Sequence, residues 1–315
     1  MNAINNAKIL AYMDRIVGSK APITADIFLT TICNNACSYC TYKRQGGEIS
    51  PQEYISFENF KFYISILLGL GVKGIILTGG GEPSLNPDFE KITNWLEENN
   101  IPYGINTNFN IFKYCNPNYL KISLDGYDEK SYFEMRGVNA YSKVISNIKL
   151  FIQYKKENSI RSKIGLQILV KNAADILNFY EAHKHLEVDY FNFRPNEDKN
   201  NKYLDAELNL ILQNLEYLKS LDNRIIINYK WHYLKDNKSQ CLAHWSQFAI
   251  DTQGNVLFCC HKPQEIIGHI TDKDILQKHH LAKLNKTTCD FPCRLTGPNN
   301  ILLNISSLSD DLEFI

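Results

Sequence analysis

Three cysteines near the start of the chain are the residues best suited to chemistry. Cys33, Cys37 and Cys40 form a Cys-x3-Cys-x2-Cys run, which places three thiols on one short loop. Thiolates in such sets bind iron–sulfur clusters or zinc. Three of them could hold three irons of a four-iron cluster and leave the fourth iron open. A structural zinc ion needs four ligands, and the next cysteine is as distant as Cys115, which we expect to be an ordinary buried thiol.

The residues around this loop favour the cluster. Tyr39 directly precedes the third cysteine, the apolar run 27–29 precedes the loop, and Gly79-Gly80-Gly81-Glu82 follows about forty residues later. Together these features resemble the radical S-adenosylmethionine (SAM) superfamily. The resemblance implies that an open iron chelates the amino and carboxylate groups of SAM. It also implies that the reduced cluster cleaves SAM to a 5′-deoxyadenosyl radical.

The resemblance further implies a set of residues that contact SAM. Gly80, Gly81 and Glu82 would meet its amino group, although a plain strand-to-helix turn is the alternative for the glycines. Ser123 and Asp125 alternate along a strand, so both side chains point to one side. Arg136 could pair with the SAM carboxylate, or could form a surface ion pair instead. The expected SAM-contacting residues are Tyr39, Gly80, Gly81, Glu82, Asn106, Ser123, Asp125 and Arg136, with Asn108 as a weaker candidate.

A second group of cysteines lies after residue 240. Cys241 precedes, and Cys259 follows, a predicted hairpin turn at Asp251-Thr252-Gln253-Gly254. This layout resembles the SPASM and twitch modules of radical SAM enzymes, which carry auxiliary clusters. The cysteine count suffices for one auxiliary [4Fe-4S] cluster, and a four-cysteine zinc site is the alternative. The expected ligands are Cys241, Cys259, Cys289 and Cys293, and whether Cys259 or Cys260 binds the cluster stays open.

Strand-like and helical patterns alternate along the chain, which indicates β/α units around a parallel sheet. We expect strands at 25–30, 73–78, 101–106, 119–124, 163–170 and 188–193. We expect helices near 54–70, 87–100, 140–158, 174–186 and 203–221, with a weak or missing helix around 110–117. Six strands are fewer than the eight of a closed barrel. The resemblance therefore implies an α/β fold, an open partial (β/α)6 TIM-type barrel with SAM at the carboxyl ends of its strands.

The expected domains are a helical prefix at 1–22, the radical SAM partial barrel at 23–224, and a small C-terminal β-hairpin/helix module with an auxiliary iron–sulfur cluster at 225–315. Lys plus Arg equals Asp plus Glu at 34 each, which gives no bulk attraction for nucleic acid or an anionic membrane. The sequence shows neither a long apolar run nor a signal peptide, so we expect a cytoplasmic protein without a membrane or nucleic-acid partner.

Two redox centres predict an oxidoreductase of the dehydrogenase type. A fully ligated auxiliary cluster can take an electron from a substrate radical, so the substrate loses a hydrogen atom, an electron and a proton. Only 32 residues precede Cys33, fewer than the about eighty of a leader-peptide module, so we expect a small polar substrate such as a cyclitol, amino sugar or nucleotide sugar. Arg194, at the end of the sixth strand, could bind it or fix a loop. The reductant would be a flavodoxin or ferredoxin.

Three alternatives remain open at this point. The protein could be a radical SAM epimerase of peptides or sugars in which Cys260 or Cys115 returns a hydrogen atom to the substrate radical. A structural role is the other possibility for the Cys260 thiol. It could be a maturase of ribosomally made peptides. More remotely, it could be a zinc-binding interaction protein without redox chemistry. Iron content and the product formed separate these alternatives.

Overall fold

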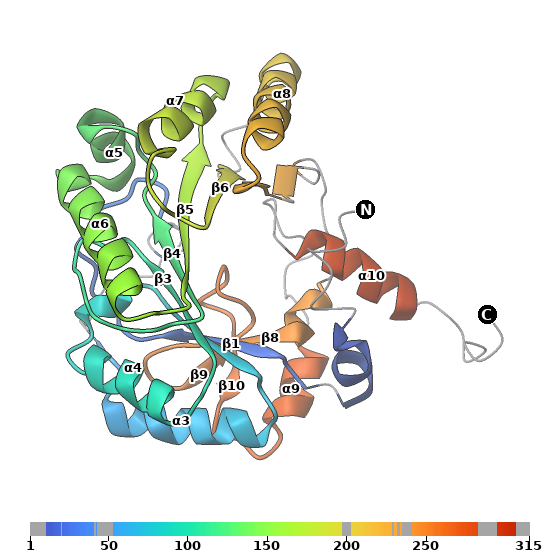
Figure 1. Ribbon diagram of the computed structural model, residues 1–315. Coiled ribbons are helices and arrows are strands. Elements are labelled where there is room, and N and C mark those ends of the chain that lie inside the picture. The colour runs from blue at the N-terminus through green and yellow to red at the C-terminus, as the bar shows by residue number, and fades with distance from the viewer. Residues whose placement is uncertain are drawn as a thin grey trace.

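One continuous sheet of ten strands forms the centre of the molecule. The computed structural model describes residues 11–19, 21–40, 42, 53–196, 203–228, 230–231, 234, 241–282 and 295–306. Across the sheet the strands run in the order β10-β9-β8-β1-β2-β3-β4-β5-β6-β7. Figure 1 shows this sheet curving behind a layer of helices, as in an open barrel.

Seven neighbouring parallel strands make up the barrel wall. They are β1 (Thr24–Phe28), β2 (Gly74–Thr78), β3 (Tyr103–Thr107), β4 (Tyr119–Ser123), β5 (Lys163–Val170), β6 (Tyr190–Pro195) and β7 (Ile225–Ile227). All six predicted strands are present, with ends that differ by up to two residues. β7 is an addition: it pairs with β6 at the wall's edge, although it lies inside the range expected for the C-terminal module.

Helices pack on the outer face of this wall (Figure 1). They are α3 (Phe57–Gly69), α4 (Phe89–Glu98), α5 (Glu129–Arg136), α6 (Tyr141–Glu157), α7 (Ala173–His183) and α8 (Asp205–Leu221). The strand residues that face them, such as Ile27, Leu77 and Ile122, are fully buried in one continuous core. Residues 108–118 between β3 and β4 contain no helix, as predicted.

The helix α5, which carries Arg136, was not predicted. Its start is fixed by a capping box in which Asp128 and Ser131 bond each other's backbone and side-chain groups. Its end is Gly137, whose φ of 69° lies in the left-handed region that favours glycine. These local signals, rather than an apolar stripe, set the position of Arg136.

The C-terminal residues continue the barrel sheet on its other side. β8 (Gln247–Ile250) pairs in parallel with β1, and β9 (Asn255–Leu257) and β10 (Ile266–His269) follow it antiparallel. The predicted hairpin turn is confirmed, with Gly254 at a φ of 88°. The remaining described elements are the 3-10 helices η2 (Pro83–Leu85) and η4 (Ala243–Ser246), α9 (Ile275–Leu281), α10 (Thr296–Ser306), and a π-helix η1 (Arg15–Ser19) within the expected prefix.

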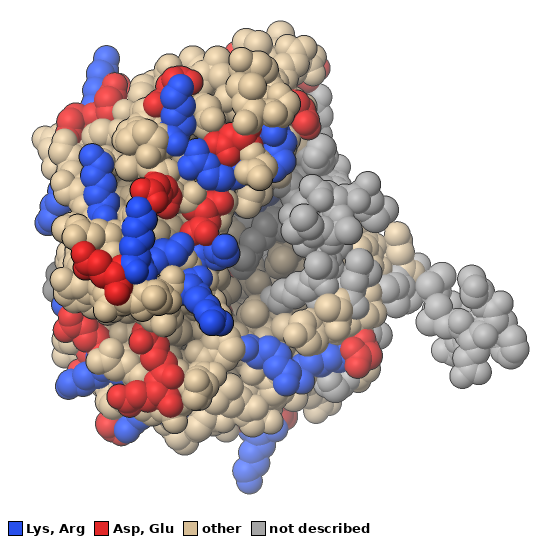
Figure 2. Space-filling view, in the orientation of Figure 1, with Lys and Arg blue, Asp and Glu red and all other residues tan. Residues whose placement is uncertain are grey.

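Charged side chains of both signs are interspersed over the face that Figure 2 shows, in keeping with the net charge of zero. Among the described residues, no helix has the length and apolar character that crossing a bilayer requires.

Candidate active site

The loop that bears the first three cysteines leaves the carboxyl end of β1. Cys33, Cys37 and Cys40 are half-buried. N–H groups point at their sulfurs: Arg136 Nη1 lies 3.3 Å from Cys37 Sγ, Asn108 Nδ2 lies 3.9 Å from Cys33 Sγ, and the Asn35 backbone N–H also bonds Cys33. The seven described cysteines of the chain form no disulfide. Three thiols that share a loop and receive N–H donors fit the cysteine ligands of an iron–sulfur cluster.

Burial raises the pKa of Cys33 to about 11, and the nearby carboxylate of Glu82 adds to the effect. Bound metal would therefore have to displace this proton. No three His, Cys, Asp or Glu side chains in the described segments are grouped as a single metal ion would need. Each thiolate of a four-iron cluster binds a different iron, so cluster ligands need not converge on one point.

Glu82 follows β2 and is held beside the cysteine loop. Its carboxylate is 2% exposed and accepts hydrogen bonds from Thr107 Oγ1 (2.6 Å), the Asn108 backbone N–H (2.7 Å) and Ser84 Oγ (2.8 Å). Its own backbone N–H donates to the Ile32 carbonyl at 2.8 Å. Thr107 was not among the predicted residues, although its place at the end of β3 could have suggested it.

The two glycines before Glu82 permit this close approach. A Cβ atom on Gly81 would lie 2.1 Å from the Ile32 carbonyl oxygen, which is far inside van der Waals contact. A Cβ atom on Gly80 would lie 2.6 Å from the ring of Tyr42. The Gly-Gly-Glu run therefore allows the turn after β2 to pass against the cysteine loop.

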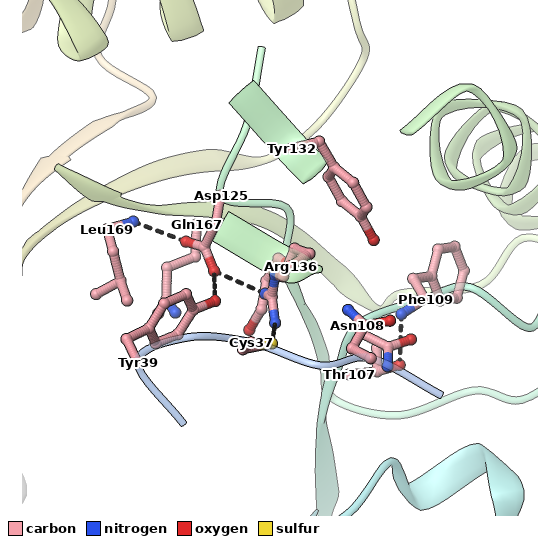
Figure 3. A network of polar contacts seen from close by, with 12 residues as sticks. Cys37, Tyr39, Thr107, Asn108, Phe109, Asp125, Tyr132, Arg136, Gln167 and Leu169 are labelled. Atoms are coloured by element: carbon pink, nitrogen blue, oxygen red, sulfur yellow. Dashed lines mark hydrogen bonds and ion pairs between the residues drawn. The ribbon is translucent and has the colours of Figure 1, made fainter. Parts of the chain in front are cut away.

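Asp125 and Arg136 form a buried ion pair at the end of β4 (Figure 3). Arg136 Nη2 lies 2.7 Å from Asp125 Oδ2, and the two side chains are 7% and 2% exposed. Asp125 also accepts hydrogen bonds from the Tyr39 hydroxyl and, at 2.7 Å, from the Leu169 backbone N–H. Since Arg136 also donates to Cys37, this network connects the cysteine loop with β4, β5 and α5.

The electrostatics of this network hold its groups in defined protonation states. Burial opposes the charge of Arg136, but the adjacent groups of Tyr39, Asp125 and Cys37 raise its pKa well above the usual value. Burial also raises the pKa of Tyr39, so the phenol stays neutral and donates to Asp125. The guanidinium stacks over the Tyr39 ring at 5.7 Å from its centroid.

The other predicted residues of this region line the same strand ends. Ser123 contributes its backbone carbonyl, which accepts from Arg136 Nη2. Asn106 donates to Thr78 Oγ1 at 3.4 Å, while its buried Oδ1 has no hydrogen-bond partner among the residues that the structure describes. Arg194 is half-buried near the end of β6, in register with Leu169 of β5. Arg194 thus lies on the same sheet, two strands from Ser123.

The C-terminal cysteines flank the hairpin that extends the sheet. Cys241 precedes η4, and Cys259 and Cys260 directly follow β9; all three are half-buried. Cys260 packs against a cluster that contains Phe28 of β1, Ala249 and Leu257. The expected ligands Cys289 and Cys293 lie outside the described residues.

His244 links the segment that begins at Cys241 with the helix α9. Its Nδ1 lies 2.6 Å from the Cys241 carbonyl oxygen, and its Nε2 lies 2.9 Å from the His279 carbonyl oxygen of α9. Its ring packs 4.4 Å from that of Phe258, the residue before Cys259. Burial lowers the pKa of His244. Both ring nitrogens face carbonyl oxygens, and a neutral ring can donate to one of them. His244 was not among the predicted site residues.

Sequence comparisons give a family match over about half of the chain. Residues 27–181 match the family model of the radical SAM superfamily. A protein named probable GTP 3',8-cyclase from Pyrococcus horikoshii is 29% identical over 130 residues, which cover 39% of this chain and 41% of that protein. Another of that name from Sulfolobus acidocaldarius is 29% identical over 161 residues, 49% of each chain. The matches thus span about half, or less, of these relatives.

Solved structures share the fold over a longer stretch. SuiB of Streptococcus suis, bound to the precursor peptide SuiA, superposes with a TM-score of 0.61 at 17% identity, covering 83% of this chain and 65% of that chain. The enzyme anSMEcpe, with bound AdoMet and the Cp18Cys peptide, gives a TM-score of 0.62 at 19% identity, covering 82% of this chain and 81% of that chain. At these identities the likeness describes the fold.

Proposed function

We propose, on the premise that this chain belongs to the radical SAM superfamily, that it is an oxidoreductase that cleaves SAM reductively and oxidises a small polar substrate. The superfamily's cofactors are a SAM-binding [4Fe-4S] cluster and SAM. When bound, they supply an electron and a 5′-deoxyadenosyl radical that can abstract hydrogen from an unactivated carbon. The protein's own residues hold these groups, orient the substrate and exclude water.

One observation carries the SAM-cleaving part of this proposal. The residues expected to bind SAM are in direct contact with the cysteine loop, because Arg136 donates to Cys37 and Asn108 bonds Glu82 while it approaches Cys33. In the proposal Cys33, Cys37 and Cys40 hold the cluster. Glu82 offers its buried carboxylate to the SAM amino group, and Arg136 offers its guanidinium to the SAM carboxylate. The wider set includes Tyr39, Gly80, Gly81, Asn106, Ser123 and Asp125.

The finer part of the proposal is a second redox centre. We place an auxiliary [4Fe-4S] cluster at Cys241, Cys259, Cys289 and Cys293, where it would accept the electron that leaves the substrate. Support comes from the hairpin between the first two of these cysteines, because β8 pairs directly with β1, the strand that leads into the first cysteine loop. His244, which bonds the Cys241 carbonyl, would fix the first ligand.

Amide side chains favour a hydroxyl-bearing substrate. Asn228 Nδ2 donates to Asn192 Oδ1 at 3.0 Å, and Asn192 Nδ2 lies 3.3 Å from Gln167 Oε1. These residues face the same side of β5 and β6 as Arg194, the candidate substrate-binding residue. A row of neutral donors and acceptors matches cyclitols, amino sugars or nucleotide sugars better than an apolar ligand does.

The names of the similar proteins suggest other substrates. The product analysis described below distinguishes these from a small polar substrate. The GTP 3',8-cyclase matches cover half of the chain or less, so they support the shared SAM chemistry more than a substrate. SuiB and anSMEcpe were solved with peptides. A peptide maturase, or an epimerase in which Cys260 returns a hydrogen atom, is therefore the second candidate. Cys260 supports the epimerase because it packs on Phe28, close to the cysteine loop in sequence.

Metal and product analysis test this proposal. After anaerobic purification we expect about eight irons and matching acid-labile sulfide per chain. Replacing Cys33, Cys37 and Cys40 together with alanine should leave about half of that iron. Zinc without sulfide would contradict the proposal and favour the zinc-binding alternative.

The product then separates the enzyme candidates. We incubate the reconstituted protein with SAM, a flavodoxin or ferredoxin-type reductant and candidate sugars, conditions that match a cytoplasmic enzyme. A dehydrogenase forms a two-electron-oxidised product. Solvent deuterium incorporated at one carbon, and lost in Cys260→Ala, would favour the epimerase instead. Turnover of peptides but not sugars would favour a maturase.

A further inference from the structure

Asn108 is the one described residue that touches both Glu82 and a thiol of the first cysteine loop. Its backbone N–H donates to Glu82 Oε2 at 2.7 Å. Its side-chain Nδ2 donates to Asn34 Oδ1 at 2.7 Å and lies 3.9 Å from Cys33 Sγ. Asn108 is 5% exposed, so water competes little for these contacts.

The surrounding residues hold Asn108 in this position. Its Oδ1 accepts from the Asn110 backbone N–H at 2.9 Å, and Figure 3 shows it next to Thr107 and Phe109 at the end of β3. The Asn110 side chain donates to Asn35 Oδ1 and accepts from the Tyr132 hydroxyl at 3.1 Å. Asn108 and Asn110 thus bond Asn34 and Asn35 of the cysteine loop, and the Asn108 side chain also reaches Cys33 Sγ, which the Asn35 backbone N–H bonds as well.

A hydrogen bond to a cluster thiolate changes the energy of the two redox states unequally. Reduction adds a negative charge to the cluster and its thiolates, so an N–H donor stabilises the reduced state more than the oxidised one. We propose that Asn108 is a positioning residue: its side-chain N–H donates to Cys33 and so raises the reduction potential of the cluster held by Cys33, Cys37 and Cys40. The inference rests on the proposed function, which assigns the cluster to these cysteines.

The position of Asn108 links this potential to SAM binding. Glu82, the expected partner of the SAM amino group, is fixed by the Asn108 backbone, which every substitution except proline retains. A change of the side chain therefore removes one of the donors to Cys33, while the Glu82 contact and the bond from the Asn35 backbone N–H stay. One variant can thus show the effect on the reduction potential of the cluster separately from any effect on the affinity for SAM.

The test is a redox titration of the holoprotein, monitored by electron paramagnetic resonance. The signal measured is that of the cluster whose spectrum changes when SAM is added. In Asn108→Ala we expect the equilibrium constant for one-electron reduction to fall by about threefold to tenfold, the tenfold limit being a shift of 59 mV to lower potential. Asn108→Asp keeps the shape but replaces the donor with a charged acceptor, so its potential should fall further. Affinity for SAM should change by less than the reduction constant does.

Asn110→Ala is the matched control, because it removes the bonds to Asn35 and Tyr132 without removing a thiolate donor. We expect its potential to equal that of the wild type. Wild-type potentials in both Asn108 variants, or an equal shift in Asn110→Ala, would overturn the inference while leaving the proposed function intact. A wild-type protein that assembles no reducible cluster sensitive to SAM would overturn both.

Discussion

Replacing Asp125 with asparagine should expose how much the buried ion pair contributes to the fold. Asparagine keeps the shape of the side chain, tolerates the φ of 50° at this position, and can still accept from the Leu169 backbone N–H. What it loses is the negative charge that lies 2.7 Å from Arg136 Nη2. The guanidinium, 7% exposed, then remains buried without a carboxylate, beside Cys37, the Ser123 carbonyl and the Tyr39 ring.

The magnitude follows from this burial. Removing one partner of a buried ion pair typically costs about 3–5 kcal/mol. Because the contact with Cys37 remains, we expect the lower end, about 3 kcal/mol. At about 2.1 cal/mol/K of unfolding entropy per residue, 315 residues make this a fall in Tm of about 5 °C. Thermal unfolding followed by circular dichroism, under the same anaerobic conditions for both proteins, measures it.

A double variant tests the reasoning behind this number. In Asp125→Asn with Arg136→Met, no unpaired charge is buried, so the double variant should be more stable than Asp125→Asn alone. The exposed pair of Lys156 and Glu187 serves as the control, because Glu187→Gln should leave the Tm unchanged. An Asp125→Asn protein with wild-type Tm, or a double variant whose losses simply add, would refute the argument.

Three further predictions concern single side chains. Gly81→Ala should abolish iron binding at the first site, because the new Cβ meets the Ile32 carbonyl oxygen, whereas Gly69→Ala, with no atom within 4 Å, should retain iron in the same assay. Burial lowers the pKa of His183 to about 4, so its contribution to stability is complete above pH about 6.5 and decreases toward pH 4. The Tm of His183→Gln should therefore fall less between pH 7 and pH 5 than the Tm of the wild type. An equal fall in both proteins would contradict this. His244→Phe should lose about half of the iron while SAM cleavage persists, and full iron content would rule out a role in holding the auxiliary cluster.

The barrel strands could be predicted because their sequences carry the pattern that the fold requires. Short apolar runs such as Ile27-Phe28-Leu29 and Ile75-Ile76-Leu77 are typical of buried strands in a parallel sheet, and Gly79-Gly80-Gly81 follows the second run. β7 was missed because three isoleucines are too short a signal. α5 was missed because its sequence has few apolar residues, and a capping box defines it instead. The pairing of β8 with β1 joins residues more than 200 positions apart, which no local pattern reveals.

The candidate site, like the fold, could be predicted from the sequence only in part. Residue types and spacing were enough to single out Cys33, Cys37, Cys40 and Glu82, since each lies in a short motif. Which groups bond one another depends on the three-dimensional arrangement. The bond from Arg136 to Cys37 needs α5 to end beside the cysteine loop, and no sequence pattern predicted that helix. The roles of individual residues toward SAM stay predictions.

The central claim is that the loop with Cys33, Cys37 and Cys40 drives reductive cleavage of SAM. The most direct measurement is the release of 5′-deoxyadenosine from SAM by the anaerobically reconstituted protein in the presence of a reductant. We predict release by the wild type, and none by the variant in which all three cysteines are alanine. Release by that triple variant at the wild-type rate would contradict the account.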